Sequence, residues 1–161
     1  MSKVEAKLES LGLALPPALK VPAGLTLPFP WVNVRGNRVL VSGHGPQDPD
    51  GTLAQPFGQL GGAVSVEQGK ELAQKVALGM LGSLKRELGD LDRITGWCRI
   101  LGMVNCVADF DKQPLVINGF SELILEVFGP EVGRHARSAV GVAGLPLGFA
   151  VEIEAEVLIG D

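Results

Sequence analysis

Apolar and polar residues alternate near the C-terminal end of the chain, within residues 136–157. From Phe149 onwards the odd-numbered positions are apolar as far as Val157, which is typical of a strand with one buried face. The intervening positions hold three glutamates: Glu152, Glu154 and Glu156. A shorter alternating run begins at Arg137, and a stretch rich in Gly and Pro separates the two runs. The pattern predicts a terminal β-hairpin that carries a guanidinium and carboxylates on one sheet.

Two internal segments have apolar residues at helical spacing. The first begins at Ser65, which with the glutamine three residues later predicts a capping box, and Gly89 ends it. The second opens at Pro114 and is terminated by residues 129–130, a Gly-Pro pair. Residues 94–107 lie between these helices and are apolar on both faces, so they predict a strand that is buried on both sides.

The N-terminal part of the chain predicts shorter elements. Residues 2–11 suit a short helix, and five prolines within residues 14–30 favour an extended arm without regular structure. Residues 31–35 and 38–42 predict a hairpin around a Gly-Asn turn, after which a Gly- and Pro-containing segment breaks the strand. We expect a further short strand near residues 55–61.

This order of elements predicts an α+β fold with a single sheet and two main helices. Right-handed crossovers place both helices on one face of the sheet. The central strand is apolar toward the other face too, so we expect a second copy of the chain to cover it in a closed oligomer. We interpret residues 1–161 as a single domain, in which 1–30 form the helix and proline-rich arm and 31–161 the core.

Composition restricts the functional classes. The chain is 46% hydrophobic and 20% charged, with a formal net charge of −4 and a pI of about 5.2. No cluster of Lys and Arg offers a surface for a phosphate backbone, which disfavours nucleic-acid binding. We find no apolar run that could span a membrane and no secretory signal, and we interpret Cys98 and Cys106 as free thiols, so a cytoplasmic location is expected. No metal-ligand spacing is apparent.

The C-terminal motif resembles the reactive intermediate deaminases, also called the YjgF or endoribonuclease L-PSP family. Members end with a proline or alanine before Arg-Ser, a short strand, Leu-Pro, and a strand of the form Glu-Ile-Glu-Ala. Residues 136–138, 145–146 and 152–155 match these parts in order. The family's early signature, Ser-Gly followed by a polar residue and Pro, is matched by residues 42–46. The resemblance covers about residues 28–159 and leaves the N-terminal segment as an extension typical of a subgroup.

The resemblance implies a chorismate-mutase-like fold and a homotrimer with one site in each cleft between subunits. It implies hydrolysis of enamines and imines derived from amino acids, which yields 2-oxo acids and ammonia without a metal or cofactor. By position, Arg137 matches the arginine that holds the substrate carboxylate, and Glu152 the glutamate that positions water. Ser42, Gly43 and Asn118 match residues that line the cleft. A guanidinium fork suits a carboxylate, and a carboxylate can take a proton from water.

The chain departs from the family pattern at three positions. Ala139 stands where many members have cysteine, Phe29 where many have tyrosine, and His44 where many have glutamine. Phe29 can pack against a substrate but cannot donate a hydrogen bond. These departures leave a second hypothesis open, in which the chain binds a small 2-oxo acid without turnover. A third, RNA cleavage, follows from the older family label and is disfavoured by the acidic balance.

The candidate residues also have structural interpretations. Arg137 could pair with Glu152 or a neighbouring carboxylate, and Glu152 could be a solvated strand residue. Asn118 could form a local cap, and His44 could be a general acid or base, or simply part of the cleft wall.

Overall fold

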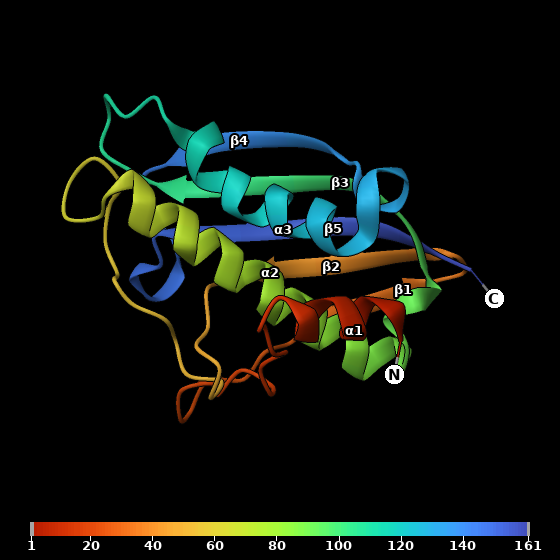
Figure 1. Ribbon diagram of the computed structural model, residues 1–161. Coiled ribbons are helices and arrows are strands. Elements are labelled where there is room, and N and C mark those ends of the chain that lie inside the picture. The colour runs from red at the N-terminus through yellow and green to blue at the C-terminus, as the bar shows by residue number, and fades with distance from the viewer. Residues whose placement is uncertain (1, 161) are drawn as a thin grey trace.

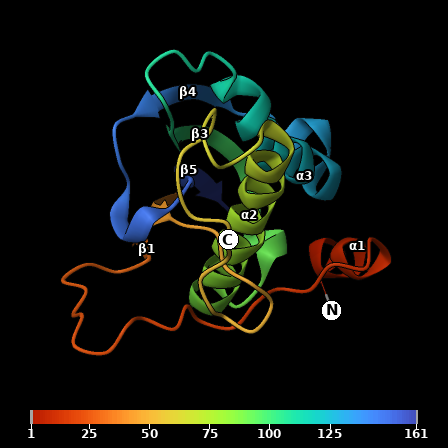
Figure 2. The same ribbon diagram turned by 90° about the vertical axis from the view of Figure 1, so that its left-hand side faces the viewer.

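The computed structural model describes residues 2–160. Its helices are α1 (Lys3–Ser10), α2 (Val66–Leu88) and α3 (Gln113–Gly133), with 3-10 turns η1 (Leu91–Arg93) and η2 (Pro146–Gly148). Its strands are β1 (Val32–Arg35), β2 (Arg38–His44), β3 (Ile94–Asn105), β4 (Ala136–Val142) and β5 (Val151–Ile159). One five-stranded sheet has the order β1-β2-β5-β3-β4, and the helices lie on one side of it (Figures 1 and 2). The α+β prediction with both main helices on one face is confirmed.

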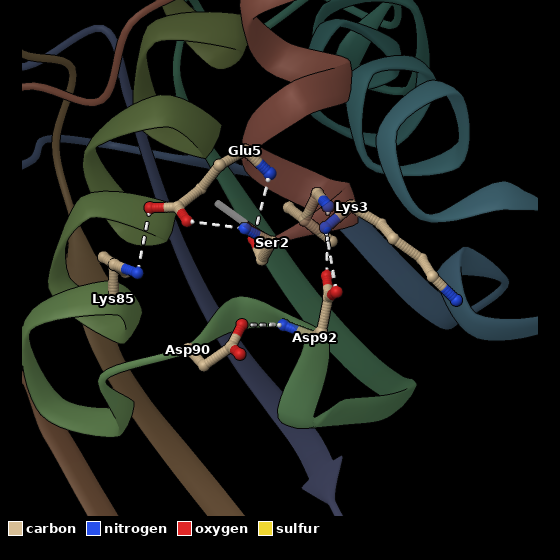
Figure 3. Close-up of polar contacts among 7 residues, drawn as sticks. Ser2, Lys3, Glu5, Lys85, Asp90 and Asp92 are labelled. Atoms are coloured by element: carbon tan, nitrogen blue, oxygen red, sulfur yellow. Dashed lines mark hydrogen bonds and ion pairs between the residues drawn. The ribbon is translucent and has the colours of Figure 1, made fainter.

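Side chains from two other elements hold the N-terminus of α1. The predicted capping box is present, because Glu5 N–H donates to Ser2 Oγ at 3.1 Å and Ser2 N–H donates to the Glu5 carboxylate at 3.2 Å. The carboxylate of Asp92 in η1 accepts from the first two N–H groups of the helix at 2.8 and 3.0 Å (Figure 3). Lys85 of α2 pairs with Glu5 at 2.9 Å (Figure 3). The extension is therefore anchored to the core.

The two long helices begin and end near the predicted residues. Ser65 caps α2 in a complete capping box, and Gly89 follows the helix with φ of 78°. A left-handed conformation favours glycine at such a position. In α3 the chain leaves helical geometry at Gly129, with φ of 75°, and then makes one further turn to Gly133. No helix within residues 2–160 is both long and apolar enough to cross a membrane.

Glycine lets α2 and α3 approach closely where they cross. A Cβ on Gly119 of α3 would overlap the carbonyl oxygen of Lys70 in α2. A Cβ on Gly69 would lie 3.1 Å from a methyl group of Val116. This close packing places the first half of α3 over the sheet, above β3 and β4.

The proline-rich arm has no helix or strand, as predicted, and it is hydrogen-bonded to the core. Arg86 donates to the carbonyl of Pro16 at 3.2 Å, and the buried Gln47 donates to that of Pro17 at 2.9 Å. The strand expected near residues 55–61 is wrong, because this segment forms only isolated bridges at Leu60. The strand predicted for residues 38–42 extends two residues further, because β2 reaches His44 through a register shift before the Gly- and Pro-containing segment ends it.

The predicted terminal hairpin is wrong. β3 lies between β4 and β5, pairs in parallel with β4 and is antiparallel to β5. Helix α3 crosses over from β3 to β4, as parallel neighbours require. The chain then returns across the end of β3 to enter the sheet between β2 and β3. Arg137 therefore lies on an edge strand, two strands away from Glu152.

The two faces of the sheet differ in their cover. Cross-strand partners share a face, and successive residues of a strand alternate between faces. Ile100 of β3 stands opposite Ala155 of β5, and both are buried beneath the helices. The other face, which we call the open face, is covered by none of α1, α2 and α3 (Figure 2). It displays Leu101 and Met103 as half-buried side chains and Leu40 at 40% exposure.

Candidate active site

Arg137 projects from β4 toward the first half of α3. Its Nη2 donates to Asn118 Oδ1 at 2.7 Å and to the carbonyl oxygen of Pro114 at 3.2 Å. Its Nη1 donates to Ser121 Oγ at 3.1 Å. These bonds use three of the five N–H donors of the guanidinium. Helix α3 thus fixes a partly buried cation at the edge of the sheet.

A second layer of hydrogen bonds lies behind Arg137. Ser121 Oγ is 2.9 Å from His135 Nε2, and His135 Nδ1 is 2.7 Å from the carbonyl oxygen of Gly133. The His135 ring packs edge-on against Phe120, with ring centroids 6.4 Å apart. Partial burial lowers the pKa of His135, and the nearby Arg137 charge lowers it further. Partial burial also lowers the pKa of Arg137, while Glu122 acts in the opposite direction.

Ala139 follows Arg137 on the same face of β4 and is also partly buried. In register, Arg137 stands opposite Ile100 and Ala139 opposite Gly102. We call Arg137, Asn118 and Ala139 the guanidinium half-site.

Glu152 lies on the open face of the sheet. It stands opposite Met103, three residues from Ile100, so its side chain projects away from the helices. The carboxylate lies directly over Gly43, where a Cβ would overlap Glu152 Oε1. Burial raises the pKa of Glu152, and the charge of Glu154 raises it further. A carboxylate with a raised pKa is a stronger base than an ordinary glutamate.

Ser42 and Phe29 lie on the same face as Glu152. Both line a hollow of about 400 Å³ whose floor includes Leu101 and Glu154. The Ser42 hydroxyl donates to the carbonyl of Pro30 at 2.8 Å, and this bond holds the arm against the edge of the hollow. Phe29 is 46% exposed. We call Glu152, Gly43, Ser42 and Phe29 the carboxylate half-site.

His44 follows Gly43 in the chain, but its side chain lies beneath the helices, on the face of the sheet opposite Glu152. Only 4% of it is exposed, and its ring bonds the carbonyl of Ser42 at 2.6 Å through Nδ1 and Ser83 Oγ at 2.9 Å through Nε2. Burial lowers its pKa to about 4, and Arg86 also lowers it. The residue is therefore uncharged near neutral pH and supports the backbone beside Gly43.

The structure thus separates the expected site residues into two groups on opposite faces of one sheet. Asn118 forms a hydrogen bond within the chain, as one interpretation of the sequence expected, and its partner is Arg137. Arg137 has no carboxylate partner within 4 Å in residues 2–160, so the alternative in which it pairs with Glu152 or a neighbouring carboxylate is absent from the single chain. Sequence analysis missed Ser121 and His135. The spacing from Asn118 to Ser121 could have indicated Ser121, because residues three apart lie on the same face of a helix and can contact the same side chain.

Known proteins resemble the chain over nearly its whole length. A curated relative, Protein TCP17 of Trypanosoma cruzi, is 42% identical over 155 residues, which cover 96% of this chain and 93% of that protein. The crystal structure of protein Atu1372 from Agrobacterium tumefaciens has a TM-score of 0.85 and 38% identity, and covers 98% of this chain and 93% of its own. A structure from Shewanella oneidensis MR-1, described as a putative endoribonuclease, has a TM-score of 0.86 and 28% identity. The match covers 97% of this chain and 99% of that one.

A family model agrees with these similarities. The model described as "YjgF/chorismate_mutase-like, putative endoribonuclease" matches residues 5–153, which include every residue of both half-sites. The match, the shared fold and the identities converge on a single assignment. The chain belongs to the YjgF family of chorismate mutase-like proteins.

Proposed function

We propose that neighbouring copies of this chain join a guanidinium half-site to a carboxylate half-site, and that the cleft between them hydrolyses small imines derived from amino acids. The separation of Arg137 and Glu152 on opposite faces of one sheet carries this proposal. One chain cannot place both side chains on the same small substrate. Two chains can, if the β4 edge of one copy meets the open face of the next.

The open face supports such a contact. It combines the half-buried Leu101 and Met103 with a hollow of about 400 Å³. Contact between two different surfaces of the same chain is heterologous, so it must close into a ring or grow without limit. Closed assemblies of more than one size could join the half-sites in this way, and the resemblance to the family implies three copies. A homotrimer with one cleft between each pair of neighbours is the assembly that we propose.

Each half-site has a distinct role in the proposed reaction. The guanidinium of Arg137 binds the substrate carboxylate through the N–H groups that its bonds to α3 do not use, and so orients the C=N bond. Glu152 accepts a proton from water as the water oxygen bonds to the carbon of the protonated imine, and the C=N π pair moves to nitrogen to give a neutral carbinolamine. The protonated Glu152 returns this proton to the nitrogen, the C–N bond breaks to release ammonia, and the hydroxyl proton is lost to the ammonia as the carbonyl of the 2-oxo acid forms. The carbon is already electrophilic, so this scheme requires no nucleophilic side chain.

Turnover of unstable imines tests this proposal. An amino-acid oxidase generates the imine in the assay mixture. The rate of 2-oxo acid release is then measured with and without the protein. We expect acceleration by the wild type, and a loss of about 10²- to 10⁴-fold in Glu152→Gln, the typical contribution of a positioned acid–base group. A folded, trimeric wild type that gives no acceleration would overturn the deaminase assignment.

Ala139 and Phe29 favour one alternative, in which the cleft binds a 2-oxo acid without turnover. Neither side chain can donate a proton or a hydrogen bond. Binding of 2-oxobutanoate that Arg137→Ala abolishes, together with no imine hydrolysis, would favour this alternative.

A further inference from the structure

We infer that Ser121 and His135 are positioning residues that orient the guanidinium of Arg137 toward a bound carboxylate. This inference rests on the proposed function, because it assigns how the substrate-binding cation is held. The two side chains come from α3 and from the loop before β4, and neither lies in the sequence motifs that indicated the family.

The direction of each hydrogen bond follows from chemistry. The carbonyl oxygen of Gly133 can only accept, so the His135 Nδ1 atom 2.7 Å away carries the hydrogen. In the neutral imidazole, Nε2 is then a bare acceptor, and the Ser121 hydroxyl at 2.9 Å must donate to it. With its hydrogen committed, the Ser121 oxygen presents only lone pairs to Arg137 Nη1 at 3.1 Å.

This chain of bonds makes Ser121 a fixed acceptor. Without His135, the hydroxyl could rotate, and its oxygen would no longer be held as an acceptor for Arg137. Asn118 Oδ1 accepts from Nη2 of the same guanidinium at 2.7 Å. With His135, Asn118 and Ser121 both accept, one from each terminal nitrogen. Together with the bond from Nη2 to the carbonyl oxygen of Pro114, these bonds commit three N–H groups to α3 and fix the plane of the guanidinium. The other two N–H groups make no hydrogen bond within residues 2–160 and are available to a ligand.

The chain contains a second arrangement of the same kind. Arg86 donates to Ser83 Oγ at 2.9 Å, Ser83 lies 2.9 Å from His44 Nε2, and His44 Nδ1 lies 2.6 Å from the carbonyl of Ser42. There too a carbonyl fixes the histidine tautomer, and the serine is left as an acceptor for arginine. The same order of carbonyl, histidine, serine and arginine thus occurs twice in the chain.

Two measurements on the full-length protein test the inference, and the first requires no activity. In ¹⁵N NMR spectra, neutral His135 should be the Nδ1–H tautomer, and the Arg137 Nη signals should be resolved because rotation is restricted. In Ser121→Ala the guanidinium should rotate more freely, so that the Arg137 Nη signals merge into one averaged signal. In Ser121→Thr, which keeps the hydroxyl, the signals should stay resolved. Ser10→Ala, on the exposed end of α1, is the matched control.

The second measurement is affinity for 2-oxobutanoate by calorimetry, with KM and kcat for imine hydrolysis. Ser121→Ala should weaken binding and raise KM by about tenfold while kcat changes little, the size expected for one lost hydrogen bond to a charged group. His135→Phe keeps a ring against Phe120 and should give a smaller loss of affinity.

If the wild type neither binds 2-oxobutanoate nor hydrolyses imines, but Ser121→Ala averages the Arg137 signals, the proposed function fails and the positioning role stands. Unchanged Arg137 signals in Ser121→Ala would overturn the positioning role.

Discussion

Arg137 Nη2 donates to Asn118 Oδ1 at 2.7 Å, and this bond links the edge strand β4 to helix α3. An amide oxygen at this position fixes the guanidinium without neutralising it. A carboxylate in the same place would form a charge-assisted pair and compete with any anionic ligand. The identity of residue 118 therefore controls whether the cation is available.

A pair of substitutions at Asn118 tests this relationship. Asn118→Ala removes one anchor and should weaken 2-oxobutanoate binding by about tenfold. Asn118→Asp should weaken it further, by about 10²-fold, because the new carboxylate occupies the guanidinium. Calorimetric titration of both variants measures the difference. Binding to Asn118→Asp that equals or exceeds binding to Asn118→Ala would show that Arg137 does not recognise the carboxylate.

Gly43 leaves space for the Glu152 carboxylate, since a Cβ there would overlap Oε1. Gly43→Ala should therefore displace this carboxylate and reduce kcat by at least about tenfold in a protein that still folds. Gly144→Ala is the matched control, because no atom lies within 4 Å of its added Cβ. Equal turnover in the two variants would show that Glu152 takes no part in the reaction.

The charge of Glu154 should shift the pH dependence of turnover. Burial and Glu154 both raise the pKa of Glu152, and a protonated Glu152 cannot accept a proton from water. The rate should therefore fall as the pH drops through this raised pKa. In Glu154→Gln the pKa of Glu152 falls, so the acidic limb of the profile of log kcat/KM should move to lower pH. Glu156→Gln, on the same face but paired with Arg38, serves as comparison; a limb that stays in place in Glu154→Gln contradicts the assignment.

His44 should make the protein sensitive to acid. Its pKa is about 4 in the fold against an ordinary value of 6.5, so the unfolded chain binds more protons between these values. The free energy of unfolding should be independent of this group above pH 6.5 and should decline as the pH falls from 6.5 to 4. The loss is on the order of 3 kcal/mol. Urea unfolding of wild type and His44→Phe across this range measures it, and parallel pH profiles for the two proteins would refute it.

Local signals in the sequence predicted the helices well. The capping boxes at Ser2 and Ser65 and the left-handed Gly89 all depend on residues within one turn of the helix end, and all three are present. The alternating pattern of β5 also placed Glu152 and Ile153 on opposite faces, as observed.

Strand pairing could not be predicted in the same way. Two alternating runs around a Gly- and Pro-rich stretch are compatible with a hairpin, but pairing depends on contacts distant in sequence. Here β5 pairs with β2 and β3, and β3 lies between β5 and β4, so neither alternating run pairs with the other. His44 likewise belongs to the helix side only because of the register shift after Val41, which no periodicity in this short segment indicated.

Arg137 of one copy should act together with Glu152 of another. Mixing Arg137→Ala with Glu152→Gln under conditions of subunit exchange tests it most directly, because each variant alone should be nearly inactive. Equal amounts should recover about a quarter of the wild-type rate, since each cleft in a ring draws its two half-sites independently from the two variants. A mixture that remains as inactive as its components, although subunits have exchanged, would contradict a site shared between copies.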